Sequence, residues 1–257
     1  MGSLNGIIDF LYPRTCSACE KQTCSSEQRD NFFCPDCSQL LAVRHQASLC
    51  SICGEDYFSV SGDICPFCRI FAEDNLRLRS IFKYEPQIKK IIKQFKYHNQ
   101  RFLAEYFSYQ LFDALINKKL YPRIIWDIVL PLPSSVSMLS ERGFNHCYLI
   151  TKRLAEKLQL PCYILALQRN KDCNAQARLK LSKRLDNVED SFTAERSYVR
   201  DRNILLVDDV ITSGATIFSA TKALFLSGAK GIDVLTVARS SNFSKNRLKL
   251  LLQLNEK

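Results

Sequence analysis

The chain has 257 residues, 46% of them hydrophobic, and its 36 Lys and Arg against 26 Asp and Glu give a formal net charge of +10. This length suits one good-sized hydrophobic core with room for a second small module. No run approaches the roughly 18 consecutive apolar residues of a membrane span, and the start has no signal-peptide pattern, so a cytoplasmic protein is expected.

Cysteines dominate the first part of the sequence. Eight of the twelve form four Cys-x-x-Cys pairs before residue 70. A two-residue gap lets a tight turn aim both thiolates at one ion, and two such turns complete a tetrahedral Cys₄ site. Four regular pairs favour zinc over disulfides or redox-active dithiols. The predicted metal ligands are Cys16, Cys19, Cys34, Cys37, Cys50, Cys53, Cys65 and Cys68.

Eight thiolates suit two zinc ions with a structural role, because a filled Cys₄ site leaves no open position for a catalytic water. Sequential pairing of the four turns is the simpler arrangement, and crossed pairing stays open. Metal binding would stabilise a segment too short to build a core of its own. The sequence therefore predicts a double zinc-ribbon module over residues 1–72.

The positive charge lies outside that module. Residues 1–70 hold five Lys and Arg against eight Asp and Glu, a formal −3, and the remainder holds 31 against 18, a formal +13. A polyanion is therefore expected to bind the second part. Residues 86–101 form a predicted helix with isoleucines on one face and Lys89, Lys93 and Lys96 on the other. These lysines are candidate nucleic-acid contacts, with a merely solvated face as the alternative.

From about residue 75, short apolar runs rich in β-branched residues alternate with segments of helical periodicity. Strands are predicted at 124–130, 163–167, 203–207 and 232–238, and helices at 147–159 and 216–228. This alternation predicts an α/β domain over residues 73–240, in which helices flank a parallel sheet. Residues 241–257 remain as a C-terminal tail. Binding sites in such folds lie at the carboxyl ends of the strands.

An acidic pair, Asp208 and Asp209, follows the predicted strand 203–207, where the backbone is expected to leave the sheet. Small residues around Gly214 come next, and they allow a ligand to approach the backbone N–H groups closely. The helix that follows favours an anion at its N-terminus. Carboxylates would suit the hydroxyls of a ribose, and the loop would suit its 5-phosphate. The predicted phosphate-binding residues are Thr212, Ser213, Gly214, Ala215 and Thr216.

The stretch VDDVITSGAT, residues 207–216, resembles the signature with which type I phosphoribosyltransferases bind 5-phosphoribosyl 1-diphosphate (PRPP). Cys-x-x-Cys turns ahead of such a domain are similar to those of the ComF family of competence proteins. LYPRTCSAC near the start and RGFN at 142–145 fit that family, and the resemblance extends to Ser240. His146 departs from it, because the family usually has Gln after RGFN.

The resemblance implies site residues beyond the acidic loop. The turn after Leu130 would be the pyrophosphate loop, and residues 170–187 would be a flexible loop that closes over the ligand. A Mg²⁺ ion would bridge pyrophosphate and ribose oxygens. The implied pyrophosphate and flexible-loop residues are Pro133, Ser134, Ser135, Arg142, Gln176, Arg178, Arg184 and Asn187.

Function, by the same resemblance, would be the uptake and handling of single-stranded DNA during natural transformation. A ComFA-type helicase would be the partner, docking on the zinc module. Aromatic residues among the lysines, such as Tyr97 and Phe102, could stack on bases. An active phosphoribosyltransferase with a nitrogen nucleophile, or a catalytically idle PRPP sensor, stays open as an alternative. No residue is identified as a general base, and no catalytic residue is assigned.

Overall fold

The computed structural model describes part of the chain, and all structural statements below concern that part. The described residues are 15, 16, 18–21, 33, 34, 37, 50–54, 64, 65, 68, 69, 75–97, 100–121, 126–170 and 191–240, with the side chain of Arg142 excepted. Several predictions lie outside them: the roles of Gln176, Arg178, Arg184 and Asn187, the side chain of Arg142, the domain boundary after residue 72, and the tail 241–257.

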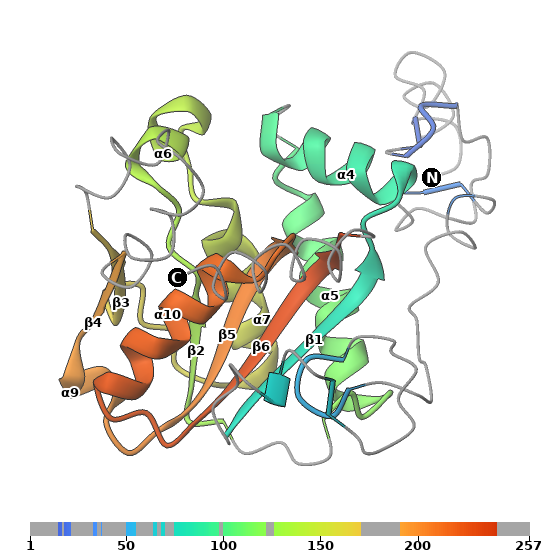
Figure 1. Ribbon diagram of the computed structural model, residues 1–257. Coiled ribbons are helices and arrows are strands. Elements are labelled where there is room, and N and C mark those ends of the chain that lie inside the picture. Colours follow the sequence, from blue (N-terminus) through green and yellow to red (C-terminus); the bar gives the residue numbers. More distant parts are fainter. Residues whose placement is uncertain are drawn as a thin grey trace, which may run out of the picture.

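The centre of the described structure is a four-stranded parallel sheet with the strand order β1-β6-β5-β2 (Figure 1). Its strands are β1 (Leu76–Lys83), β2 (Ile128–Pro131), β5 (Asn203–Ile211) and β6 (Gly231–Arg239). A separate two-stranded antiparallel sheet pairs β3 (Leu167–Arg169) with β4 (Phe192–Ala194). The helices are α4 (Pro86–Tyr97), α5 (Leu103–Ile116), α6 (Val136–Arg142), α7 (His146–Leu158), α9 (Arg196–Val199) and α10 (Ala215–Leu226).

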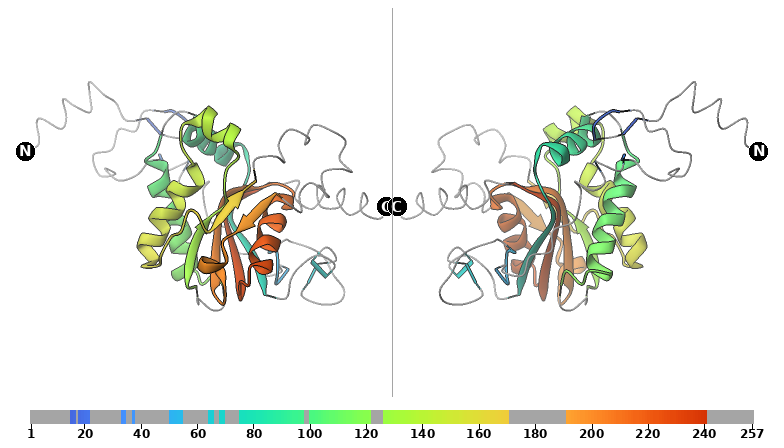
Figure 2. Two further views of the ribbon diagram at one scale, coloured as in Figure 1. Left: turned by 90° about the vertical axis from the view of Figure 1, so that its left-hand side faces the viewer. Right: turned by 90° about the vertical axis from the view of Figure 1, so that its right-hand side faces the viewer.

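Helices cover both faces of this sheet, as the predicted α/β architecture requires. The helices α5 and α7 lie on one face and α10 on the other, while α4 lies across the carboxyl ends of the strands (Figures 1 and 2). Central strands are apolar on both faces because both are covered. In β5, Leu205 and Val207 pack toward α5 and α7, and Leu206 packs toward α10. None of the described helices is both long and apolar enough to cross a lipid bilayer.

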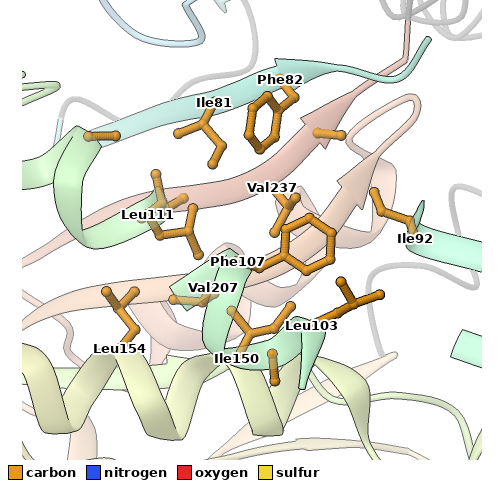
Figure 3. Close-up of a cluster of buried hydrophobic side chains, with 14 of the residues drawn as sticks. Ile81, Phe82, Ile92, Leu103, Phe107, Leu111, Ile150, Leu154, Val207 and Val237 are labelled. Carbon is orange, nitrogen blue, oxygen red and sulfur yellow. The ribbon is translucent and has the colours of Figure 1, made fainter. Parts of the chain in front are cut away.

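The larger apolar cluster fills the space between the sheet and the α5/α7 layer. Side chains from β1, β5, β6 and these helices meet there, among them Phe107 on α5 and Ile150 on α7 (Figure 3). The isoleucines of α4, together with Phe95, join the same cluster and are buried. The predicted amphipathic helix is thereby confirmed, and its apolar face fixes α4 above the strand ends.

A buried polar network joins β1 and β6 near the start of β6. The carboxylate of Asp233 accepts two hydrogen bonds from Arg77, from Nε to Oδ1 and from Nη2 to Oδ2, each 2.6 Å long. It accepts a third from the Trp126 indole, at 2.8 Å. The Tyr121 hydroxyl donates to the Val234 carbonyl at 2.6 Å. These bonds satisfy a charge that the sheet would otherwise bury at a cost.

One predicted strand is wrong. Of residues 163–167, only Leu167 lies in a strand, and that strand is antiparallel β3 rather than part of the main sheet. Ile164 and Leu165 lie in an exposed turn, and within the described part of the chain this segment pairs with the main sheet through one isolated bridge, between Cys162 and Val129. A five-residue apolar run does not by itself distinguish a buried strand from an exposed turn.

The strand β5 is longer than predicted. It runs on through Asp208 and Asp209 to Ile211, so the acidic pair lies within the strand and not beyond it. The pairing explains this, because β2 ends opposite Val207 while β6 continues to pair as far as Ile211. The acidic residues therefore stand where β5 has lost one neighbour, at an opening in the sheet edge.

Candidate ligand cleft and zinc centres

Two groups of four cysteines come together in the structure, and each has the geometry of a metal site. Within each group, the Sγ atoms all lie within 4.8 Å of one another. Cys19 and Cys34 are 3.7 Å apart between their Sγ atoms, and Cys53 and Cys65 are 3.8 Å apart. Tetrahedral bonds of roughly 2.3 Å place sulfur atoms about 3.8 Å apart, so both groups fit zinc.

The cysteines pair sequentially, so the crossed arrangement is excluded. One group consists of Cys16, Cys19, Cys34 and Cys37, and the other of Cys50, Cys53, Cys65 and Cys68. Backbone N–H groups point at the ligating sulfurs: Cys16 accepts from the amide of Cys34 at 3.3 Å, and Cys50 accepts from the amide of Cys65 at 3.3 Å. Such bonds stabilise thiolates, as a structural zinc site needs.

The two cysteine groups dock on different parts of the α/β domain. The first packs against α4 and α5, where Phe33 meets the Tyr106 ring edge-on at 4.6 Å and Glu20 pairs with Lys90 at 3.0 Å. The second lies along β1, whose Leu78 amide donates to the Ile52 carbonyl at 2.6 Å. Each group thus contacts the α/β domain directly.

A cleft of about 310 Å³ opens at the carboxyl ends of the strands. It is lined by Tyr84, Lys96, Leu132, Pro133, Ser134, Met138, Cys147, Arg169, Asp208, Asp209, Val210, Ile211, Thr212, Ser213, Gly214, Thr216 and Ile217. The acidic pair, most of the predicted phosphate loop and part of the predicted pyrophosphate turn thus share one cavity. A site at this end of a parallel sheet is the general rule for such folds.

The acidic pair carries the main electrostatic feature of the cleft. Burial raises the pKa of the Asp208 carboxyl to about 8, and the charge of neighbouring Asp209 acts in the same direction. The Asp209 amide, which donates to Asp208 Oδ1 at 2.8 Å, and the cations Lys96 and Arg169 lower that pKa. The pair therefore holds a proton near neutral pH, because two adjacent carboxylates do not ionise independently.

The loop after β5 leads directly into α10. Gly214 is the N-cap, with a left-handed φ of 85° that favours glycine, and its carbonyl accepts from the Phe218 amide at 2.9 Å. No acidic residue lies in the first turn of α10, so the helix dipole and backbone amides there favour an anion. Thr212 and Thr216 are exposed at the cleft, whereas Ala215 begins the helix without lining it.

The turn after β2 also lines the cleft, and the RGFN segment supports it. Pro133 and Ser134 line the cleft, but Ser135 is buried and caps α6 by accepting from the Met138 amide at 3.3 Å. Asn145 caps α7 in the same way, accepting from the Tyr148 amide at 3.1 Å. Its side chain also accepts from the Ser134 hydroxyl at 3.3 Å, which ties the RGFN segment to the cleft wall.

Cys147 lines the cleft without being available as a nucleophile. Its thiol donates to the Val207 carbonyl at 2.8 Å. Burial raises the pKa of Cys147 well above its usual value, and the nearby charges of Asp208 and Asp209 raise it further. A thiol held protonated in this way packs and does not attack. His146, the residue that departs from the ComF pattern, is buried beside it, against the rings of Phe95 and Phe144.

Among the described residues, two cations face the acidic pair, Lys96 and Arg169. The sequence alone placed neither of them in the cleft. Lys96 Nζ lies 2.6 Å from Asp209 Oδ2, and the two side chains are only 16% and 15% exposed. Arg169, from β3, lines the same cavity with its guanidinium 5.5 Å from the Phe192 ring. Lys96 lies in the last turn of α4. Its position near the strand ends could be predicted only if the segment before α4 was first recognised as the strand β1.

The other predicted nucleic-acid residues share α4 with Lys96 but differ from it in exposure. Lys89 and Lys93 are exposed, whereas Lys96 is largely withdrawn from water in its ion pair with Asp209. Of the aromatic residues near them, Tyr97 and Phe102 are exposed, at 53% and 41%. Two exposed lysines of α4 and two exposed aromatic rings, at the end of α4 and just before α5, are therefore available to a partner.

Comparison with known proteins gives a consistent picture for both parts of the chain. Residues 7–69 match the family described as Double zinc ribbon domain. The competence protein ComFC of Bacillus subtilis (strain 168) is 27% identical over 221 residues, which is 78% of this chain and 88% of that protein. The DNA utilization protein YhgH of Escherichia coli (strain K12) is 24% identical over 223 residues, 81% of this chain and 97% of that protein.

Two solved structures show a distant likeness to this chain. A glutamine PRPP amidotransferase from B. subtilis aligns over 56% of this chain with 17% identity and a TM-score of 0.40. This chain covers 30% of that enzyme's length. An adenine phosphoribosyltransferase aligns over 55% of this chain and 74% of its own length, with 18% identity and a TM-score of 0.37.

Proposed function

We propose, for a chain that belongs to the ComF family of competence proteins, that the cleft at the carboxyl end of β5 binds PRPP together with Mg²⁺. One observation carries this proposal. The acidic pair and the N-terminus of α10 face a single cavity, so groups that suit ribose hydroxyls stand beside groups that suit a phosphate.

The roles of individual residues follow from their positions in the cleft. Asp208 and Asp209 would take the ribose hydroxyls, and their oxygens suit a hard cation such as Mg²⁺, which binds few protein carboxylates and relies on substrate phosphates. The loop 212–216 would take the 5-phosphate. Pro133 and Ser134, across the cavity, would lie near the diphosphate. This proposal concerns binding and not turnover. An assay of pyrophosphate release from PRPP in the presence of a panel of nitrogenous bases would distinguish an active transferase from a PRPP sensor.

Titration calorimetry with PRPP tests the proposal. The wild-type protein is expected to bind PRPP in a Mg²⁺-dependent manner, and Asp208→Asn/Asp209→Asn is expected to lose at least 100-fold in affinity. Glu141→Gln/Asp201→Asn is the matched control, because it removes two carboxylates at exposed positions. Unchanged affinity in the first double variant, or an equal loss in the control, contradicts the proposal.

We further propose that the exposed end of α4 contacts single-stranded DNA in the cytoplasm. The relatives' names, competence protein and DNA utilization protein, support a role with DNA. Lys89 and Lys93 supply phosphate contacts, and Tyr97 and Phe102 supply rings on which bases can stack. A cytoplasmic site fits eight cysteines kept reduced for zinc.

Fluorescence anisotropy with a labelled oligonucleotide, over a range of salt concentrations, tests this second proposal. Charge reversal in Lys89→Glu/Lys93→Glu is expected to weaken binding at least tenfold and to make the salt dependence shallower by about 1.4, the value for two lost contacts on a single strand. Lys152→Glu/Lys230→Glu, at exposed sites elsewhere, is the control. A flat salt response in the wild type rules out this mode of binding.

For the zinc module, we propose a ComFA-type helicase as the partner. The formal −3 of residues 1–70 makes the module unsuited to DNA and leaves a protein partner as the better match. Calorimetric titration of the purified helicase into the zinc-loaded chain tests this partner assignment, and binding is expected. Equal binding by a variant that lacks residues 1–72 would contradict docking on the zinc module.

A further inference from the structure

The ion pair between Lys96 and Asp209 places a fixed cation where a divalent metal would be expected. The Nζ and Oδ2 atoms are 2.6 Å apart, and both side chains are largely withdrawn from water. Lys96 cannot be treated as one of the solvated lysines of α4, because Lys89 and Lys93 on the same helix are exposed while Lys96 lines the cleft. The helix itself is held by its buried isoleucines.

An acidic pair open to solvent would ordinarily attract free divalent cations. Here, the ammonium group already neutralises one member of the pair, so a bare Mg²⁺ ion approaching Asp209 meets a positive charge within a few ångströms. Repulsion at that range is strong in a partly buried site. Mg²⁺ also gives up its water reluctantly, so the two carboxylates must be fully available to hold it alone.

The balance changes when the metal arrives with an anionic ligand. The phosphoryl oxygens of a sugar diphosphate can accept hydrogen bonds from Lys96, which then releases the carboxylate to the metal and the sugar hydroxyls. Arg169 adds a second cation to the same cavity. The cleft then contains the acidic pair, two cations, the metal and the anion, so that each cation has an anionic neighbour.

We propose that Lys96 is a selectivity residue: its ion pair with Asp209 makes the cleft reject free divalent cations and accept the metal only as a complex with an anionic sugar diphosphate. The inference rests on the proposed function, because it takes the metal–PRPP complex as the ligand. It assigns to Lys96 a role that neither exposed lysine of α4 has.

Mn²⁺ alone is the probe, because its electron paramagnetic resonance signal reports free metal directly. Zinc-loaded wild-type protein is expected to bind Mn²⁺ weakly, and Lys96→Met is expected to bind it at least tenfold more tightly. Lys93→Met, one turn earlier on α4 and exposed, is the matched control and should behave as wild type. Asp209→Asn in the Lys96→Met background should abolish the gain, which assigns the bound ion to this cleft.

Addition of PRPP gives the second readout. PRPP is expected to tighten Mn²⁺ binding at least tenfold in the wild type and in Lys96→Arg, which keeps the charge, but by a smaller factor in Lys96→Met. Equal Mn²⁺ affinity in wild type and Lys96→Met, with a folded variant shown by circular dichroism, overturns the inference. If PRPP has no effect on any variant while Lys96→Met still gains Mn²⁺ affinity, the proposed PRPP function fails and the exclusion of free cations by Lys96 stands.

Discussion

Removing Arg77 tests how much the buried network of β6 contributes to stability. The Asp233 side chain is 5% exposed and that of Arg77 is 32% exposed. Arg77→Met keeps the apolar stem but removes both guanidinium donors, so that among the described residues the Trp126 indole is the donor left to the carboxylate. Breaking a buried pair from one side costs about 3–5 kcal/mol, and the partial exposure of Arg77 favours the lower end, about 3 kcal/mol. The melting temperature should then fall by about 6–12 °C.

Equilibrium urea unfolding of the zinc-loaded protein measures this loss in the free energy of unfolding. The slope of that free energy against urea concentration should be the same in the variant and the wild type. Arg153→Met is the control, because Arg153 pairs with Glu105 at 2.7 Å but both side chains are more than 40% exposed, so a loss below about 1 kcal/mol is expected. Adding Asp233→Asn to Arg77→Met should recover at least half of the loss. A cost for Arg77→Met no larger than that of the control refutes the reasoning.

Four further variants test the site and its support. Because the folded pKa of Asp208, about 8, is raised above the unfolded value, its protonated form stabilises the fold at low pH; this contribution falls as pH rises from the unfolded pKa toward 8, and the fall ends above pH 8. In the wild type, the free energy of unfolding should fall by up to about 1.4 kcal/mol per pH unit from this source, and Asp208→Asn should remove that fall. Urea unfolding from pH 6 to 9 measures it. Gly214→Ala should cost about 1–3 kcal/mol in the same assay, because its φ is 85° and the added methyl group would meet an aromatic ring at 3.1 Å. Cys50→Ser should lower the zinc content from two ions to one and speed hydrogen exchange at the Leu78 amide, whereas Cys16→Ser should leave that amide protected.

The acidic loop could be located from sequence because its signal is local. An apolar strand, two carboxylates and a glycine at a helix start are contiguous, and chain continuity alone places them at a strand end. The cysteine groups were predictable for the same reason, since each turn brings two ligands together. Pairing between turns needed the tertiary structure, and it proved sequential.

The cations of the cleft could not be assigned in this way, because they come from other elements. Lys96 looks like its neighbours on α4 by periodicity, and only the packing of that helix over the strand ends turns it toward Asp209. The signal that was available lay in LRLRSIFK, residues 76–83, whose alternation of apolar and polar residues is typical of a strand. Recognising β1 would have placed Tyr84 and the start of α4 at the carboxyl edge of the sheet.

The position of α4 links sites that are distant in the sequence. Its Lys90 and Gln94 contact Glu20 beside the first cysteine group, at 3.0 and 3.3 Å, and its Lys96 contacts Asp209 in the cleft. These contacts lie within about 9 Å of one another along a single α-helix, which is stiff enough to carry a displacement from one contact to the other. Thermodynamic reciprocity then applies: if filling the cleft shifts α4, the affinity of the first zinc ion must change by the same factor as zinc changes the affinity of the cleft. Metal retention thereby becomes a readout of the cleft that requires no catalytic turnover.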